Sequence, residues 1–233
     1  MPLSEPKRRA AVLTAIPVEY EAVRAHLTEV KEITHPRGTV YEQGMFPCPG
    51  GASWSVVVGE IGAGNTNAAL ESERAISFFE PNVLLFVGVA GGIKDVALCD
   101  VVAATKVYGY ESGKAKRTFE PRPSVGASSY AMVQRARAVG RRTDWFRRVD
   151  SCPVDLAPRV HVGPIAAGEK VVASSRSDVF RFLRRAYGDA IAVEMEGWGF
   201  LQAAHANQDL NALVVRGISD LLEGKSTLRA NNG

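Results

Sequence analysis

The sequence predicts an α/β fold: a single domain with a central mixed, mostly parallel β-sheet flanked by helices. Two observations predict it. Short runs of Val, Ile, Leu and Ala recur along the chain, and many of them lack alternating polar residues, which is typical of strands buried on both faces. Helix-like segments lie between these runs, and alternation of strands and helices is characteristic of this class. A chain of 233 residues is long enough for one such domain.

Seven apolar runs are predicted as strands: residues 11–16, 55–58, 83–89, 101–107, 160–166, 191–193 and 213–215. Helices are predicted at residues 19–27, 65–79, 178–187 and 198–206, and another near 128–149. In segment 65–79, small and apolar residues recur every three to four positions, which is the spacing of one helix face. Asn65 or Thr66 is expected to cap the start of this helix, and Pro81 lies just beyond its end.

Charge is distributed unevenly, although the net charge of the whole chain is only +3. Residues 112–150 hold ten Lys or Arg against three Asp or Glu, and this stretch interrupts the alternation of strands and helices. A solvated surface is the ordinary explanation of such a segment. A surface for phosphates, nucleic acid or a partner subunit is the alternative.

Neither membrane insertion nor secretion is indicated. No run reaches the roughly 18 apolar residues that a membrane helix needs, and the N-terminus lacks the pattern of a secretory signal. The three cysteines, Cys48, Cys99 and Cys152, are far apart and form no CxxC pair, so we expect neither a disulfide framework nor a zinc site. A reducing, cytoplasmic location follows from this cysteine usage.

Two glycine clusters follow predicted strands: GEIGAG (59–64) and GVAGG (88–92). Glycines allow a ligand to approach the backbone closely, and a tight turn at the strand end is the alternative. Neither cluster has the GxGxxG spacing of a dinucleotide-binding fold. The segment LLEGKST (221–227) also fails as a phosphate-binding loop, because Ser219 stands where the first glycine is required.

Three acidic residues lie just beyond predicted strands: Glu19, Glu196 and Asp220. Ligands of open α/β sheets bind at the carboxyl ends of strands, so these carboxylates can share one site if the three strands point the same way. Three unrelated helix caps or loop acids are the alternative. Glu194 precedes Glu196 by two residues, and an extended chain would place both on one face.

At these residues the chain resembles the nucleoside phosphorylase/nucleosidase superfamily, and within it the 5′-methylthioadenosine/S-adenosylhomocysteine nucleosidases. The resemblance covers roughly residues 11–222 and rests on AIPVEYEAV (15–23), VGEIGAGNTNAA (58–69), FVGVAGGI (86–93), VEMEG (193–197) and VVRGISD (214–220). It implies one nucleoside phosphorylase-like domain over residues 1–233, assembled as a homodimer or larger homo-oligomer. It also implies a small-molecule purine nucleoside or nucleotide as ligand, with no cofactor, no metal, and no nucleic-acid or membrane partner.

The resemblance also assigns roles to individual residues. Glu19 matches the acid that activates a water for attack on the ribose. Asp220, steadied by Ser219, matches the acid that protonates N7 of the leaving purine. Glu196 matches the carboxylate that binds the ribose hydroxyls, with Met195 packing beneath the sugar. The other substrate contacts expected on this basis come from Val172, whose backbone would meet the purine, and from Val171, Val89, Ala90 and Gly91.

These residue types suit cleavage of an N-glycosidic bond, because that reaction develops positive charge on the sugar and negative charge on the base. Asp220 must be neutral to act as the acid, and burial near Ile218 and Leu221 is expected to favour that form. Glu194 is left with a structural role.

The predicted activity is hydrolysis of an adenosine-type substrate (methylthioadenosine, S-adenosylhomocysteine or an adenine nucleotide) with release of adenine. Glu19 lies where one phosphorylase branch carries an Arg, and an anionic side chain there would repel phosphate. Val89 stands where relatives have a hydroxyl residue, and this removes another contact for phosphate or water. A phosphate-dependent purine nucleoside phosphorylase and a non-catalytic nucleoside-sensing module of a larger protein are the alternatives.

Three departures from the family concern the substrate and the extent of the chain. Val171 stands where many nucleosidases place an aromatic ring against the purine. The Arg-rich insertion at residues 112–150 replaces a shorter loop, and its arginines would suit a charged 5′ group. The family continues past VVRGISD into a C-terminal helix that we expect to be missing here, so we expect one module of a longer protein.

Overall fold

The computed structural model describes residues 8–48, 50–142, 145, 158–207 and 210–222. The strands are β1 (Arg9–Thr14), β2 (Thr28–Thr34), β3 (Val40–Pro47), β4 (Ser53–Glu60), β5 (Val83–Gly92), β6 (Val101–Gly109), β7 (Gly113–Ala115), β8 (Phe119–Pro121), β9 (Ser124–Ala127), β10 (Val160–Ala167), β11 (Ala192–Glu194) and β12 (Asn211–Leu221). The helices are α1 (Pro17–Arg24), α2 (Asn65–Phe79), α3 (Tyr130–Gly140), α4 (Asp178–Ala186) and α5 (Gly197–Ala206).

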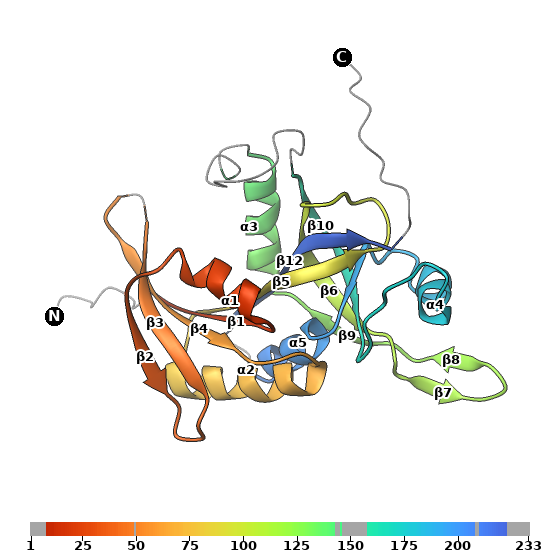
Figure 1. The fold of residues 1–233 in the computed structure, drawn as a ribbon, viewed down its shortest axis with the longest axis horizontal. Helices are drawn as coiled ribbons and strands as arrows, with labels where there is room; N and C mark the ends of the chain where they lie inside the picture. Colours follow the sequence, from red (N-terminus) through yellow and green to blue (C-terminus); the bar gives the residue numbers. More distant parts are fainter. Residues whose placement is uncertain (1–7, 49, 143–144, 146–157, 208–209, 223–233) are drawn as a thin grey trace, which may run out of the picture.

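One large mixed sheet organises the described part of the molecule, in the order β11-β10-β6-β12-β5-β1-β4-β3-β2, with β9 paired to β6. Helices α1 and α3 lie on one side of this sheet, and α2 and α5 lie on the other (Figure 1). Parallel pairings join β4, β1, β5 and β12, and also β6, β10 and β11. The predicted α/β class with a central mixed sheet is confirmed.

All seven predicted strands form, as do the predicted helices, and α2 has the predicted bounds. The expected helix near 128–149 corresponds to α3, which ends at Gly140, and the expected positions 143–144 and 146–149 lie outside the described residues. The antiparallel strands β2 and β3 were not predicted from the sequence. For β2 the reason is its position at the edge of the sheet: none of its side chains is buried, so it carries no apolar run.

The start of α2 differs from the expectation. Its N-cap is Gly64, and neither Asn65 nor Thr66 caps it with a side chain. The Asn65 side chain is used elsewhere: its Oδ1 accepts a hydrogen bond from the Gly199 backbone N–H at 2.9 Å, and its Nδ2 donates to the Gly168 carbonyl at 3.4 Å. Asn65 therefore ties α2 to α5 and to the end of β10.

Five strands of the sheet close into a ring. Strand β5 pairs with β12, β12 with β6, β6 with β10, and β10 with β11, while β11 pairs back with β5 at Val193–Gly91. In this last pairing β11 runs antiparallel to β5, whereas β1 and β12 run parallel to it. We expected the acids to share one site only if their three strands point the same way, and this expectation is wrong. Strand β11 runs opposite to β1 and β12, but closure of the ring brings its end back alongside β5.

One core cluster lies between the sheet and the α2–α5 layer, and others lie against α1, α3 and α4. Phe86 of β5 and Phe200 of α5 are fully buried and meet edge to face, with ring centroids 5.4 Å apart. Helix α5 approaches α2 so closely that a Cβ built on Gly199 would lie 1.9 Å from the Asn65 carbonyl oxygen. Only glycine permits this contact, which fixes where the start of α5 lies.

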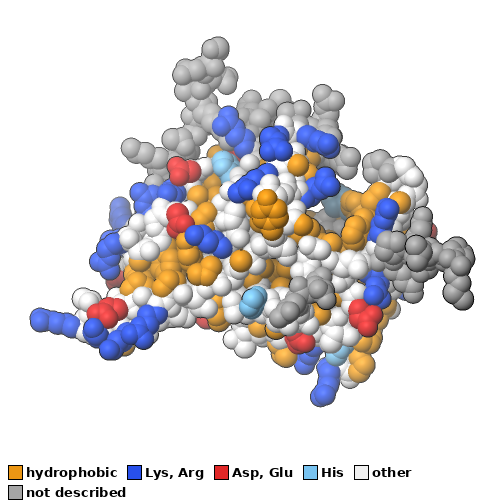
Figure 2. Space-filling view, turned by 180° about the vertical axis from the view of Figure 1, so that it is seen from behind, with side chains coloured by type: hydrophobic (Ala, Val, Ile, Leu, Met, Phe, Trp, Pro, Cys, Tyr) orange, Lys and Arg blue, Asp and Glu red, His pale blue; other side chains and the backbone are white. Residues whose placement is uncertain are grey.

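The described part of the Arg-rich segment consists of the β7–β8 hairpin, strand β9 and helix α3. The hairpin extends away from the body of the molecule (Figure 1), and all six of its strand residues are exposed. Seen from behind, Lys and Arg side chains gather at the end of the molecule that holds this hairpin (Figure 2). The expected absence of a family C-terminal helix concerns residues 223–233, which lie outside the described residues. Among the described helices, none has the length and apolar character needed to cross a bilayer.

Candidate active site

A cavity of about 480 Å³ lies where β1, β5, β11 and β12 come together. Every residue that the sequence assigned to the site borders it: Glu19, Val89, Ala90, Gly91, Val171, Val172, Met195, Glu196, Ser219 and Asp220. The alternative of three unrelated acids does not fit this arrangement. Four carboxylates line the cavity, since Glu194 joins Glu19, Glu196 and Asp220.

Arg216 lies at the base of this group and was not singled out from the sequence. The register of β12 places it opposite Gly88 of β5, and it is fully buried. Its Nη2 donates hydrogen bonds to Glu194 and, at 3.1 Å, to Glu196. Its guanidinium stacks on the Phe86 ring, 4.5 Å from the centroid. The available signal was a lone charge inside the apolar run VVRGI, because a buried Arg is almost always paired.

Glu19 is held by backbone N–H groups. As the third residue of α1, it accepts hydrogen bonds through Oε2 from the Ala15 N–H at 2.8 Å and the Ile16 N–H at 3.3 Å. Its Oε1 accepts one from the Val89 N–H at 2.8 Å. A Cβ on Gly88 would lie 2.5 Å from Oε1 of Glu19 and 2.1 Å from Nη1 of Arg216, so only glycine admits both side chains. The charged heads of Glu19 and Arg216 thus both lie against this point of β5.

Glu194, the last residue of β11, and Glu196, two residues further on, make different contacts. Glu194 accepts hydrogen bonds from Arg216 and from the N–H groups of Glu196 and Gly197, so it holds the bend between β11 and α5. Glu196 accepts one from the Gly64 N–H at 3.1 Å, at the start of α2, where the helix dipole favours a negative charge. The structural role expected for Glu194 agrees with these contacts.

Burial raises the pKa of Glu196 to about 6, and the nearby carboxylates of Glu194 and Glu19 act in the same direction. Arg216 and the Gly64 N–H oppose this rise, because both stabilise the charged form. Glu196 is therefore ionised at neutral pH and becomes protonated just below it.

Also bordering the cavity, Ser219 Oγ donates a hydrogen bond to Asp220 Oδ1 at 2.9 Å. Asp220 is exposed, so the expected burial beside Ile218 and Leu221 is wrong. The reason lies in β12, whose register shifts between Ile218 and Asp220 and which leaves both Ser219 and Asp220 facing the open side of the cavity. Val172 is buried nearby, whereas Val171 is 78% exposed at the rim.

Residues 9–231 match the profile of the phosphorylase superfamily. The chain belongs to this superfamily. A relative in Escherichia coli, the ATP nucleosidase Cap17, is 28% identical over 93% of this chain. A 5′-methylthioadenosine/S-adenosylhomocysteine nucleosidase of Listeria monocytogenes is 25% identical, over 93% of this chain and 88% of its own length. The family resemblance inferred from the motifs is confirmed.

The fold is also that of solved members. The methylthioadenosine/S-adenosylhomocysteine nucleosidase of S. pneumoniae, determined with a transition-state inhibitor, superposes with a TM-score of 0.71 at 26% identity, covering 91% of this chain and 85% of that one. The present chain spans about half the length of the ATP nucleosidase, since the match covers 46% of that relative. Within the described residues, no group of three or more His, Cys, Asp or Glu is arranged to hold a metal ion.

Replacing Arg216 with Met should lower the free energy of unfolding by about 3–5 kcal/mol near pH 7.5, because Glu194 and Glu196 would become buried charges without a cation. The loss should be smaller at pH 5, where Glu196 is largely neutral. The sign follows from its raised pKa: a carboxyl group with a higher pKa in the folded state favours folding at low pH and loses this effect as the pH rises through 6.

Urea unfolding at both pH values measures this difference. The control is Arg181→Met, which breaks an exposed pair with Asp178 and should change stability by about 1 kcal/mol or less. An Arg216→Met protein as stable as this control would contradict the assigned pairing.

Proposed function

We propose that the chain is a purine nucleoside N-ribohydrolase that cleaves the N-glycosidic bond of an adenosine-type substrate and releases adenine. One observation carries the proposal: Glu19, Glu196 and Asp220 border a single cavity, around a buried arginine that holds the two glutamates of VEMEG. Cleavage of this bond needs a negative environment at the sugar and a proton donor at the base, and we assign the first to Glu19 and Glu196 and the second to Asp220.

The sugar is proposed to lie between Glu19 and Glu196. Ionised Glu196, anchored by Arg216 and the Gly64 N–H, accepts hydrogen bonds from the ribose hydroxyls. Met195, between the two glutamates, forms the apolar surface beneath the ring. Glu19 is the base for the attacking water, and its three backbone N–H donors fix the carboxylate in place so that it needs no reorganisation during reaction.

The purine is proposed to lie between Asp220 and the loop of Val171 and Val172. Asp220, exposed in the open cavity, becomes covered when the base packs on it, and such desolvation favours the neutral acid that protonates N7. Ser219 orients the carboxyl group through its 2.9 Å hydrogen bond. Val89, Ala90 and Gly91 form the adjoining wall of the cavity.

Water is favoured over phosphate as nucleophile on electrostatic grounds. The cavity is bordered by four carboxylates, and phosphate near Glu19 would meet their repulsion. Arg216 cannot serve as a free phosphate clamp, because it is fully buried and engaged by Glu194 and Glu196. The named nucleosidase relatives, one acting on ATP and others on methylthioadenosine and S-adenosylhomocysteine, support hydrolysis of adenine nucleosides or nucleotides here.

We further propose that residues 1–233 form one domain and that the protein assembles as a homodimer or larger homo-oligomer. It is proposed to act in the cytoplasm and to need no cofactor. The free thiols of Cys48 and Cys99 suit a reducing compartment. Light scattering coupled to gel filtration measures the assembly, and a monomer at micromolar concentration would remove that part of the proposal.

Base release tests the reaction. Methylthioadenosine, S-adenosylhomocysteine, adenosine, inosine, AMP and ATP are each incubated with the protein, with and without phosphate, and free base is quantified. We expect adenine from at least one adenine compound at the same rate with and without phosphate. Strict phosphate dependence would instead show a phosphorylase. Binding of a nucleoside without any base release would show a sensor module.

Asp220→Asn should lower kcat by about 10²–10⁴-fold, because the amide cannot deliver a proton to the leaving base. Substrate binding, measured by calorimetry, should be largely retained. The matched control is Asp95→Asn, an exposed loop residue at a positive φ that Asn also tolerates, and its kcat should be unchanged. Unchanged turnover in Asp220→Asn would refute its role as the acid.

The pH dependence of kcat/KM should show an acidic limb with an apparent pKa near 6, the value to which burial raises the pKa of Glu196. The value of kcat/KM falls as the pH decreases through about 6, because protonated Glu196 can no longer accept hydrogen bonds from both ribose hydroxyls. The limb belongs to the coupled carboxylates as a group. A profile that is flat from pH 5 to 8 would contradict the proposed sugar contact.

A further inference from the structure

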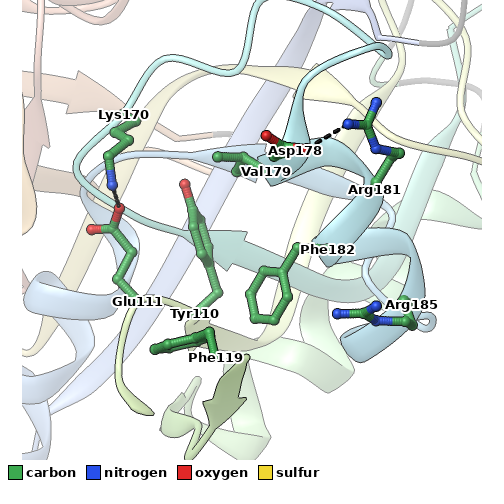
Figure 3. Close-up of a pocket in the computed structure, with 9 residues that line it drawn as sticks. All are labelled: Tyr110, Glu111, Phe119, Lys170, Asp178, Val179, Arg181, Phe182 and Arg185. Carbon is green, nitrogen blue, oxygen red and sulfur yellow. Dashed lines mark hydrogen bonds and ion pairs between the residues drawn. The ribbon is translucent and has the colours of Figure 1, made fainter. Parts of the chain in front are cut away.

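A second cavity, of about 540 Å³, lies beside the active site and is not used by the proposed reaction. It lies between helix α4, the hairpin β7–β8 and the loop after β10 (Figure 3). Its lining residues are Tyr110, Glu111, Phe119, Lys170, Asp178, Val179, Arg181, Phe182 and Arg185. Lys170 borders this cavity and the active-site cavity alike, so the two are neighbours.

The second cavity differs from the active site in charge. Three cations line it, Lys170, Arg181 and Arg185, whereas Lys170 is the single cation among the described residues that border the carboxylate-rich active site. The surrounding segments 111–122 and 178–185, taken with Lys170, hold eight Lys or Arg against three Asp or Glu. A concentration of positive charge around a concave surface attracts anions.

Two of these cations have carboxylate partners. Lys170 Nζ lies 2.6 Å from Glu111, and Arg181 pairs with Asp178 at the exposed start of α4. Arg185 has no ion-pair or hydrogen-bond partner among the residues that the structure describes, and its guanidinium extends toward the ring of Phe182 (Figure 3). Exposed ion pairs are weak, so a multiply charged anion can take over Lys170 and Arg181 at little cost.

Tyr110 supplies an independent observation. Its side chain is only 2% exposed, and within the described part of the chain its hydroxyl has no hydrogen-bond partner. Buried hydroxyls are almost always satisfied, so an unpaired one at the wall of a cavity indicates a place for a ligand atom. Burial raises the pKa of Tyr110 to about 12, which keeps the hydroxyl a proton donor. Figure 3 shows it directed toward the side of the cavity where Lys170 lies.

We propose that this cavity binds the phosphate chain of a nucleotide, through Arg185, Arg181, Lys170 and the Tyr110 hydroxyl. Guanidinium groups bind phosphate oxygens in pairs, and the rings of Phe119 and Phe182 provide an apolar wall behind them. The anion competes with Glu111 for Lys170. Since Glu111 also accepts a hydrogen bond from the Glu169 N–H, occupancy is coupled to the loop that carries Val171 and Val172.

The test is calorimetric titration of the full chain with inorganic tripolyphosphate, which needs no turnover and so stands apart from the proposed nucleosidase activity. We expect binding that weakens with added NaCl and that persists with saturating adenine in the active site. Arg181→Glu/Arg185→Glu should weaken it about tenfold or more, because two attractive charges become repulsive. The control Arg135→Glu/Arg137→Glu makes the same charge change on exposed positions of α3 and should leave the affinity within about twofold.

Tyr110→Phe is the sharper variant, because it removes one hydroxyl that is unpaired in the folded protein. It should weaken tripolyphosphate binding by about three- to tenfold while leaving the urea midpoint unchanged or higher. Tyr130→Phe, at a position 79% exposed on α3, is its control. No binding to the unaltered protein, or equal binding by Arg181→Glu/Arg185→Glu and its control, would overturn the proposal.

The phosphate chain has two possible sources, and turnover separates them. If it belongs to the substrate, Arg181→Glu/Arg185→Glu raises KM for ATP relative to KM for methylthioadenosine. If it belongs to a separate effector, tripolyphosphate alters KM for methylthioadenosine in the unaltered protein and fails to do so in the variant. A tripolyphosphate effect on methylthioadenosine turnover that survives in the variant would place the anion elsewhere and overturn the proposal.

Discussion

The buried ion cluster around Arg216 is the constraint on which the site depends. A guanidinium at zero exposure is tolerated only when carboxylates neutralise it, and here Glu194 and Glu196 do so. This pairing fixes the end of β11 against β12, the strand that follows it in sequence after helix α5. It also requires a residue without a side chain at position 88, where Arg216 and Glu19 both pack against β5.

The helices are positioned by the same group of residues. Glu196 accepts a hydrogen bond from the N–H of Gly64, the N-cap of α2. Asn65, the first residue of α2, accepts one from the N–H of Gly199 in α5. Glu196, the two helix ends and the arginine are thus parts of one hydrogen-bonded network. A displacement of any of them would move Glu196, which explains why the small residues Gly64, Gly88 and Gly199 recur at these contacts.

Much of this arrangement could be predicted from the sequence, and the failures have physical causes. Val-rich runs identified the inner strands because those strands are buried on both faces, whereas β2 is an exposed edge strand and gives no such signal. The motif residues border one cavity, yet ring closure and the antiparallel direction of β11 depend on long-range pairing that periodicity does not contain. Arg216 is visible in the sequence as a lone charge inside VVRGI. Its partners Glu194 and Glu196 can be recognised only when β11 and β12 are brought together in the fold. The exposure of Asp220 follows from a local register shift in β12, which sequence patterns do not reveal.

The most direct test of the proposed site is the structure of the protein bound to a non-cleavable adenosine C-nucleoside. We predict both ribose hydroxyls within hydrogen-bonding distance of Glu196, base N7 beside Asp220, and a water between Glu19 and the anomeric carbon, with Arg216 still paired to Glu194 and Glu196. A nucleoside whose ribose hydroxyls avoid Glu196, or whose base lies away from Asp220, would contradict it.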